Sequence, residues 1–329
     1  MSSWNTIHYT SRQIKKIEPD FFDRESFQKT NELKGKKPII LPYSVPQKKD
    51  TAVILVFFNP TSSIRIQQNI LYVVHQLKNA SIPFFIGEIC FMNEPSLFQE
   101  SESVYIFRSN SYMFYKENLI NQVIRKMAGE KYEKYVIMDA DIIFENIDWV
   151  DKISDALDKY EVIQPFEYAC KLEKNFTVDS VVITICKTEN MGHPGYVWAF
   201  RRNWFERVGG LFEYALNGGG DTCFTYCFGI AKNIHKIYSY DISNIHQDTI
   251  FGYIPGFIYH LPHGIMEKRQ YGSRIETLVT NTNKLGIHKL SDAVERNEQG
   301  IFEWKIQYRN YMNNILFTYF QNREDDNFN

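Results

Sequence analysis

The sequence of 329 residues lacks both glycine-rich signatures of phosphate binding, GxGxxG and GxxxxGK[ST]. It therefore carries neither the fingerprint of dinucleotide-binding folds nor a P-loop. The longest uninterrupted apolar run covers residues 52–58, far short of the roughly 20 residues that cross a bilayer. Residues 1–10 are polar and have no apolar core of signal-peptide length. We therefore expect a soluble, cytoplasmic protein without a transmembrane segment.

Neither charge nor cysteine dominates the composition. Lys and Arg total 37 against 39 Asp and Glu, a net charge of −2, so the basic field of a general nucleic-acid binder is missing. The five cysteines are Cys90, Cys170, Cys186, Cys223 and Cys227. This odd, scattered set indicates buried thiols in a reducing compartment and no disulfide framework. Aromatic residues make up 16% of the chain, which suits a large core and stacking surfaces for sugars or bases alike.

Strand and helix patterns alternate along the chain. Residues 51–58 (TAVILVFF) form a β-branched and aromatic run that ends at Asn59-Pro60, as a buried strand does before a turn. Further strands are predicted at 83–91, 103–107, 135–144, 178–186 and 196–200, and helices at 64–78, 117–127 and 291–320. This order favours an α/β fold with a mainly parallel sheet flanked by helices, whose ligands bind at the carboxyl ends of the strands.

We divide the chain into three parts. Residues 1–50 are polar and Lys-rich and are predicted to form an N-terminal extension. Residues 51–275 are predicted to form the α/β domain, with halves at 51–145 and 146–275. Residues 276–329 are predicted to form a helical C-terminal region, in which the acidic residues 324–326 are solvated.

The triplet Asp139-Ala140-Asp141 lies at the end of an apolar strand. Alternation along a strand would place both carboxylates on one face, where they repel each other unless a cation joins them. Mg²⁺ and Mn²⁺ accept oxygen ligands and share them with substrate phosphates. A solvated strand end, or a pair of helix caps, would also explain the two acids.

The motifs around this triplet resemble those of glycosyltransferases of the GT-A fold. They are the helix start at 116–121 (KENLIN), the segment 193–200 (HPGYVWAF), the glycine pair in 208–212 (VGGLF), the loop 218–221 (GGGD), and 260–264 (HLPHG) with Arg269, Tyr271 and Arg274. The resemblance covers residues 50 to 275. It implies that 51–145 bind a nucleotide sugar, such as a UDP-sugar, and that 146–275 bind a hydroxyl acceptor, such as a glycan.

By this resemblance, Asp141 holds Mn²⁺ or Mg²⁺, and Asp139 contacts the ribose or reaches the metal through water. A third ligand comes from His260 or His263, and the sequence leaves open which. The other donor-binding candidates are Asn59, Arg65, Asn69, Lys116, Asn121, Arg269 and Arg274. Turn-forming, helix-surface or solvated positions would explain these polar residues nearly as well.

Asp221 is the candidate general base that removes the proton of the acceptor hydroxyl. The preceding glycines leave room for a sugar near the backbone, and Gly195, Trp198, Gly219 and Gly220 are the candidate sugar-binding residues. Alternatively, Asp221 caps a helix over residues 222–230. A dedicated base favours inversion at the anomeric carbon.

Two other functions stay open. A sugar-phosphate nucleotidyltransferase normally has a glycine-rich loop after its first strand, and residues 59–63 (NPTSS) contain no glycine. A catalytically inactive carbohydrate-binding protein of the same fold would have no need to keep these carboxylates together. The oligomeric state is not predictable from the sequence.

Overall fold

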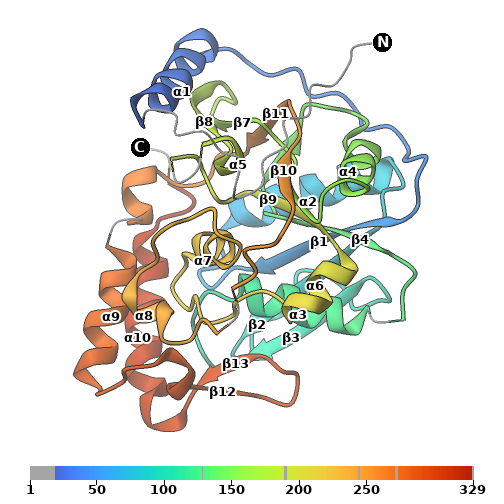
Figure 1. Ribbon diagram of the computed structural model, residues 1–329. Helices are drawn as coiled ribbons and strands as arrows, with labels where there is room; N and C mark the ends of the chain where they lie inside the picture. The colour runs from blue at the N-terminus through green and yellow to red at the C-terminus, as the bar shows by residue number, and fades with distance from the viewer. Residues whose placement is uncertain (1–18, 128, 189–190, 244, 271–272, 328–329) are drawn as a thin grey trace.

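The computed structural model describes residues 19–127, 129–188, 191–243, 245–270 and 273–327. The polar segment 1–10 and Tyr271, both used in the sequence-based interpretation, lie outside these residues. Figure 1 shows a central sheet with helices on either side of it.

The central sheet has seven strands in the order β10-β6-β9-β4-β1-β2-β3. Its strands are β1 (Thr51–Phe58), β2 (Phe84–Phe91), β3 (Val104–Ser109), β4 (Lys134–Met138), β6 (Val162–Gln164), β9 (Val197–Arg201) and β10 (Phe251–Tyr253). Strands β4, β1, β2 and β3 are parallel, whereas β9 runs antiparallel to both β4 and β6. The expected α/β class with a mainly parallel sheet is confirmed.

Alternate residues of the central strands point to opposite faces of the sheet and pack into two separate hydrophobic cores. In β1, Ala52, Ile54 and Val56 pack on one face, and the residues between them pack on the other. Helices α3 (Lys116–Lys126), α6 (Arg202–Val208) and α7 (Gly220–Cys227) cover the first face, and α2 (Ile64–Asn79) and α4 (Trp149–Leu157) cover the second. Burial on both faces explains why β1 is a continuous apolar run with no polar alternation.

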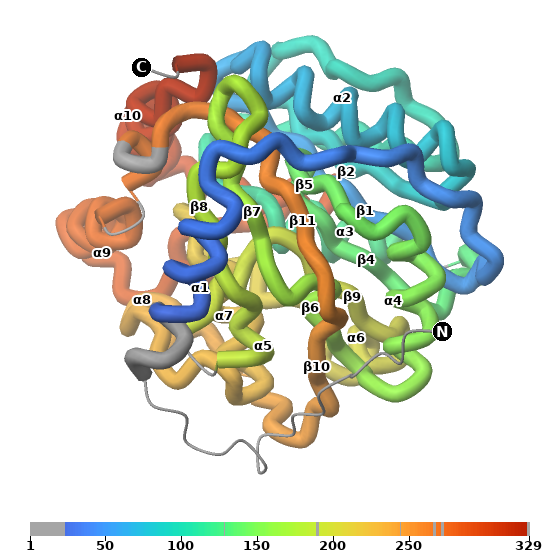
Figure 2. Tube along the Cα trace, turned by 90° about the horizontal axis from the view of Figure 1, so that it is seen from above, coloured from blue at the N-terminus to red at the C-terminus, as the bar shows by residue number. Residues whose placement is uncertain are grey.

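A second sheet lies over the α2 side of the molecule. Its strands follow the order β5 (Ile142–Phe144), β11 (Phe257–His260), β7 (Tyr168–Leu172) and β8 (Val178–Ile183). The predicted N-terminal extension contains helix α1 (Pro19–Leu33), which lies along β8 (Figure 2). The chain then stays attached to the domain, because Gly35 donates from its backbone N–H to Val178 O at 2.8 Å.

The C-terminal region is only partly helical. It contains α9 (Arg274–Lys284), a hairpin of β12 (Val294–Arg296) and β13 (Phe302–Trp304), and α10 (Ile306–Asn322). The predicted helix at 291–320 is therefore wrong in its first part. Asn297 explains the hairpin, since its side-chain oxygen accepts from the backbone N–H groups of Gln299 and Ile301 and so closes the turn. The shorter helices are α5 (Ile185–Thr188), α8 (Lys236–Ser239), η1 (Met266–Arg269) and η2 (Leu290–Asp292).

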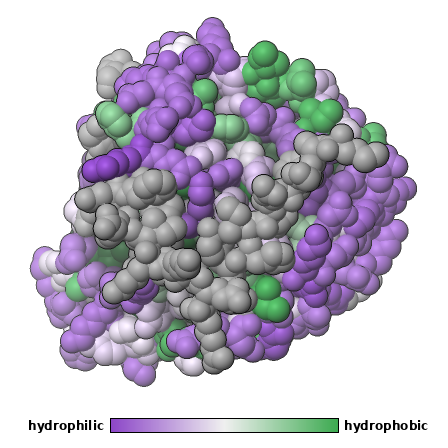
Figure 3. All heavy atoms as spheres, turned by 45° about the horizontal axis from the view of Figure 1, so that its top comes forward, coloured by the Kyte–Doolittle hydropathy of each residue, from purple (hydrophilic) through white to green (hydrophobic). Residues whose placement is uncertain are grey.

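The face drawn in Figure 3 is mainly hydrophilic where it is coloured, with separate apolar clusters. Ile39, Leu41 and Val45, in the segment before β1, are among the exposed apolar residues. In the described part of the chain, every helix falls short of the length and apolar character that a bilayer span requires. All five cysteines are free thiols, and four of them are buried.

Candidate active site

A pocket of about 230 Å³ opens at the carboxyl ends of β1, β4 and β11. This is the edge of the sheet where α/β proteins bind ligands. The polar side chains that line it are Asn69, Lys116, Glu117, Asp139, Asp141, His193, Asp221, His260, His263, Arg269, Arg274, Arg323 and Asp325. The pocket therefore gathers residues from both predicted halves of the α/β domain and from the C-terminal region.

The acidic triplet lies in a turn and not within a strand. The predicted strand 135–144 is broken, because β4 ends at Met138 in the central sheet and β5 begins at Ile142 in the second sheet. The expectation that both carboxylates share one strand face is therefore wrong. The turn separates them, so that Asp139 faces Lys116 and Asp141 faces two histidines.

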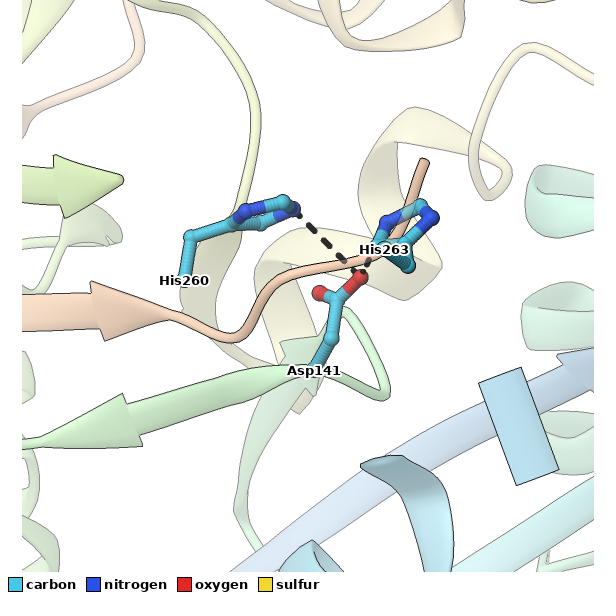
Figure 4. A group of neighbouring side chains, drawn as sticks. All are labelled: Asp141, His260 and His263. Atoms are coloured by element: carbon cyan, nitrogen blue, oxygen red, sulfur yellow. Dashed lines mark ion pairs between the residues drawn. The ribbon is translucent and has the colours of Figure 1, made fainter. Parts of the chain in front are cut away.

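Asp141, His260 and His263 form a three-residue cluster (Figure 4). The Oδ2 atom of Asp141 lies 2.9 Å from Nε2 of His263 and 3.4 Å from Nε2 of His260. One ligand atom from each residue lies within 4.8 Å of the others. Both candidate histidines are therefore brought to the same carboxylate, although the sequence predicted only one of the two.

The donor set of this cluster fits a divalent cation. Among the described residues, the buried Oδ1 atom of Asp141 has no hydrogen-bond partner. Leaving a buried carboxylate oxygen unpaired costs free energy, and a bound cation would remove this cost. Burial lowers the pKa of His260 to about 4, which keeps its imidazole neutral and able to ligate. Burial opposes ionisation of Asp141, but its two histidine neighbours outweigh this and hold its pKa well below the usual range. A carboxylate with two imidazoles suits a divalent transition-metal ion.

Asp139 lies apart from this cluster and belongs to a second group of charges. The ammonium of Lys116 lies 2.7 Å from Oδ1 of Asp139 and 2.8 Å from Oδ1 of Asp221. Burial is the main cause that raises the pKa of Asp139 to about 6, against the opposing charge of Lys116. Burial likewise raises the pKa of the neighbouring Glu117 to about 8.

Asp221 does not cap its helix. Helix α7 begins at Gly220, its N-cap residue is Gly219, and Asp221 lies in the first turn. The expected room for a sugar over the glycines is partly filled by protein. A Cβ on Gly218 would overlap the Arg274 guanidinium, and a Cβ on Gly220 would overlap the Glu117 carboxyl group. The side chain of Asp221 therefore lines the pocket and makes no capping hydrogen bond to its own helix.

The predicted sugar-binding residues separate into two groups. Gly195, Gly219 and Gly220 line the pocket. Trp198 does not, because β9 turns its indole into the core, where Nε1 donates to Pro194 O at 2.7 Å and the side chain is buried. The prediction that Trp198 binds a sugar is therefore wrong. Its place beside the cleft is taken by His193, whose ring stacks on Tyr196 at 4.1 Å between centroids.

The predicted donor-binding residues also separate. Asn69, Lys116, Asp139, Arg269 and Arg274 line the pocket, whereas Asn59, Arg65 and Asn121 do not. The Asn59 side chain is bonded in both directions to the backbone of Ser63. The Asn121 side chain is bonded in the same way to the backbone of Leu211. These two asparagines hold loops in place.

Four pocket residues come from the C-terminal region that the sequence interpretation left without a role. They are Tyr319, Phe320, Arg323 and Asp325. The predicted solvation of residues 324–326 is wrong for Asp325, whose side chain is only 4% exposed. The guanidiniums of Arg274 and Arg323 lie over the Phe114 ring, at 5.4 and 5.8 Å from its centroid. No local sequence signal marks these residues, because only the fold brings them to the pocket.

Comparisons with known proteins give structural likeness only. No protein-family model and no curated protein matches the sequence. One similar solved structure is a mutant Drosophila β-1,4-galactosyltransferase 7 in complex with manganese, UDP-Gal and xylobiose, with 15% identity and a TM-score of 0.31. The match covers 56% of this chain and 66% of that one, just under two thirds of the galactosyltransferase.

A second similar structure is a protein from Desulfovibrio desulfuricans designated a nucleotide-diphospho-sugar transferase. It has 10% identity and a TM-score of 0.31, and the match covers 72% of this chain and 97% of that one. Likeness of this degree assigns no activity to this chain.

Proposed function

We propose that this protein is a metal-dependent glycosyltransferase of the GT-A type, which moves a sugar from a nucleotide-sugar donor to a hydroxyl acceptor. One observation carries the proposal: the candidate metal-binding cluster of Asp141, His260 and His263 lines the same pocket as the carboxylate of Asp221. A site for the leaving diphosphate and a base for the acceptor are the two requirements of glycosyl transfer.

The donor half of the pocket suits a nucleoside diphosphate. A divalent cation, when bound, supplies charge neutralisation for the departing diphosphate. The chain itself adds three guanidiniums, those of Arg269, Arg274 and Arg323. Planar guanidiniums bind phosphate oxygens in pairs. We assign these arginines to the diphosphate and Asp139 to the ribose.

The acceptor half suits proton removal by Asp221. Its Oδ1 atom is paired with Lys116, while its Oδ2 atom lies toward Gly195, since a Cβ built there would be 3.1 Å from that oxygen. We propose that Oδ2 takes the proton of the acceptor hydroxyl as its oxygen attacks the anomeric carbon. The donor sugar then inverts, because a single in-line displacement needs no enzyme nucleophile.

The N-terminus of α2 argues against a sugar-phosphate nucleotidyltransferase. In such enzymes the loop after the first strand holds triphosphate, for which backbone N–H groups at a helix start are the natural donors. Here the Asp326 carboxylate accepts from the backbone N–H groups of Ile64 and Arg65 and from the Ser63 hydroxyl. The chain itself therefore fills this anion site.

A panel of UDP- and GDP-sugars with Mn²⁺, followed by nucleotide release, tests the proposal. We expect slow donor hydrolysis that EDTA stops and added Mn²⁺ restores. Asp141→Asn should abolish it, whereas Asp155→Asn, on an exposed side chain of α4, should leave it intact. Pyrophosphate-dependent exchange would instead support the nucleotidyltransferase, and donor binding without turnover would support the inactive carbohydrate-binding protein.

A further inference from the structure

The segment that follows α10 packs against the candidate metal cluster of Asp141, His260 and His263. Asp325 is the centre of this contact, since its Oδ1 atom lies 3.0 Å from Nδ1 of His263 and its backbone oxygen accepts from Gly264 N at 2.8 Å. Arg323 donates to the same Oδ1 atom at 3.1 Å. The Asp325 side chain is 4% exposed and that of His263 is 8% exposed. A carboxylate from the end of the chain is thus buried against a histidine of the site.

Both neighbours of Asp325 have anchors of their own. Glu324 pairs with Lys268 at 2.9 Å, and Asp326 accepts from Ser63 Oγ at 2.7 Å at the start of α2. The Asp326 bond to Ser63 and the backbone bond between Asp325 and Gly264 fix the Asp325 carboxylate with respect to the imidazole ring. The Glu324–Lys268 pair is exposed and adds little to this. Three consecutive acids therefore bind three different elements, and the middle one binds the histidine.

The hydrogen bonds around His263 assign its tautomer. Asp325 is an acceptor, so Nδ1 carries the proton and donates it. Arg269 is a donor, and its Nη2 atom lies 2.6 Å from Nε2 of the same ring, so Nε2 carries a lone pair. Both partners therefore specify the same neutral tautomer. In this tautomer the lone pair on Nε2 of His263 faces Oδ2 of Asp141 at 2.9 Å. Both atoms are acceptors, so a cation bound between them would satisfy both.

We infer that Asp325 is a positioning residue that holds His263 in the metal-binding tautomer and orientation. The inference rests on the proposed function, since it takes His263 to be a metal ligand. Ligand histidines in metal sites typically donate their second N–H to a carboxylate or carbonyl, which fixes the ring and raises its basicity. Here the carboxylate comes from a segment outside the α/β domain, so the last residues of the described chain complete the site.

The test combines two measurements on the full chain. Nitrogen-15 NMR of histidine-labelled, metal-free protein reports the tautomer of His263, assigned by its loss in His263→Ala. Mn²⁺ affinity is measured by titration calorimetry and by electron paramagnetic resonance of free Mn²⁺. The variants are Asp325→Ala and the near-isosteric Asp325→Asn. Glu324→Gln is the matched control, because it breaks an adjacent exposed ion pair without touching the ring.

We expect the wild type and Glu324→Gln to show the tautomer with the proton on Nδ1. Asp325→Ala should show a mixture of tautomers and bind Mn²⁺ roughly 10- to 100-fold more weakly, and Asp325→Asn should show a smaller loss. If Asp325→Ala does not fold, Asp325→Asn decides the question. Wild-type tautomer and affinity in the folded variant overturn the inference alone. A wild type that binds no Mn²⁺ overturns the proposed function instead.

Discussion

Lys116 and Asp221 form an ion pair of 2.8 Å across the pocket, between residues 105 positions apart in the sequence. The same ammonium lies 2.7 Å from Asp139. One cation thus holds two carboxylates that the sequence assigned to opposite halves of the domain. This lysine links the two sides of the pocket that we assign to the donor and to the acceptor.

Lys116→Met should therefore lower both stability and activity. It leaves Asp139 and Asp221 as like charges without their shared cation. We expect a loss of roughly 2 kcal/mol, below the roughly 3–5 kcal/mol of a fully buried pair, because solvent still reaches both carboxylates. Urea denaturation measures it. Lys34→Met removes an exposed pair with Asp179 and should change stability by less than about 0.5 kcal/mol. Equal losses in the two variants would contradict a stabilising role for the ion pairs of Lys116.

Asp221→Asn should separate catalysis from donor binding. The amide keeps the shape of the side chain but cannot accept a proton from the acceptor hydroxyl. Transfer should fall by about 10²-fold or more, while the affinity for the nucleotide stays within a few-fold, as measured by calorimetry with UDP and Mn²⁺. Asp179→Asn, on an exposed residue of β8, serves as the control. A parallel collapse of nucleotide affinity would make Asp221 a binding residue.

Most of the long elements were predictable from the sequence, because their burial follows a simple period. Strands β1 and β2 are buried on both faces and appear as apolar runs of the right length. Helix α2 buries Ile70, Val73 and Leu77 on one stripe. In these segments the local pattern and the tertiary environment agree.

The break at Asp139 was not predictable in the same way. Residues 135–138 and 142–144 are all apolar and all buried, so their pattern is that of one strand. Between them the chain passes from the central sheet to the second sheet. The pairing of β5 with β11 joins residues far apart in the sequence, so no local sequence pattern indicates it. Both acids line the pocket, but their separate partners depend on that change of sheet.

The burial of Asp325 was also beyond the sequence. A run of acids near the end of a chain is typically solvated, and its partner His263 lies 62 residues away. The pattern of charges is the same whether the segment is docked or free. Only the packing of α10 against the pocket, through Phe320 and Phe114 at 5.3 Å between ring centroids, carries the segment to the histidine.

Gly195→Ala should impair activity more than stability. The new methyl group would lie 2.9 Å from Cε1 of His193 and 3.1 Å from Oδ2 of Asp221, so it crowds the oxygen that we assign to proton transfer. We expect kcat to fall by about 10-fold, as a misplaced catalytic group does. Gly286→Ala is the opposite case, with φ of +70° and open space around the position.

Gly286→Ala should therefore cost about 1 kcal/mol of backbone strain and leave kcat unchanged. Steady-state kinetics and thermal unfolding of both variants make the comparison. If Gly195→Ala kept full kcat, Oδ2 of Asp221 would not be the atom that reacts.

The buried imidazole of His193 predicts acid sensitivity of the fold. Burial is the main cause that lowers its pKa to about 3, against about 6.5 in an unfolded chain. As the pH falls below 6.5, the unfolded state takes up a proton that the folded state does not, so the free energy of unfolding decreases. The slope from this one group is at most about 1.4 kcal/mol per pH unit, and it ends near pH 3.

His193→Asn should remove most of that slope. The asparagine oxygen can replace Nδ1 as acceptor for Gly195 N, a bond of 3.0 Å, but it does not titrate in this range. Urea denaturation between pH 4 and 7, with EDTA present so that metal binding does not contribute, measures the slope in both proteins. We expect the difference between them to persist at high salt, because a desolvation cost is not screened as surface charges are. Identical slopes in the two proteins would show that His193 is protonated in the folded state as readily as in the unfolded chain.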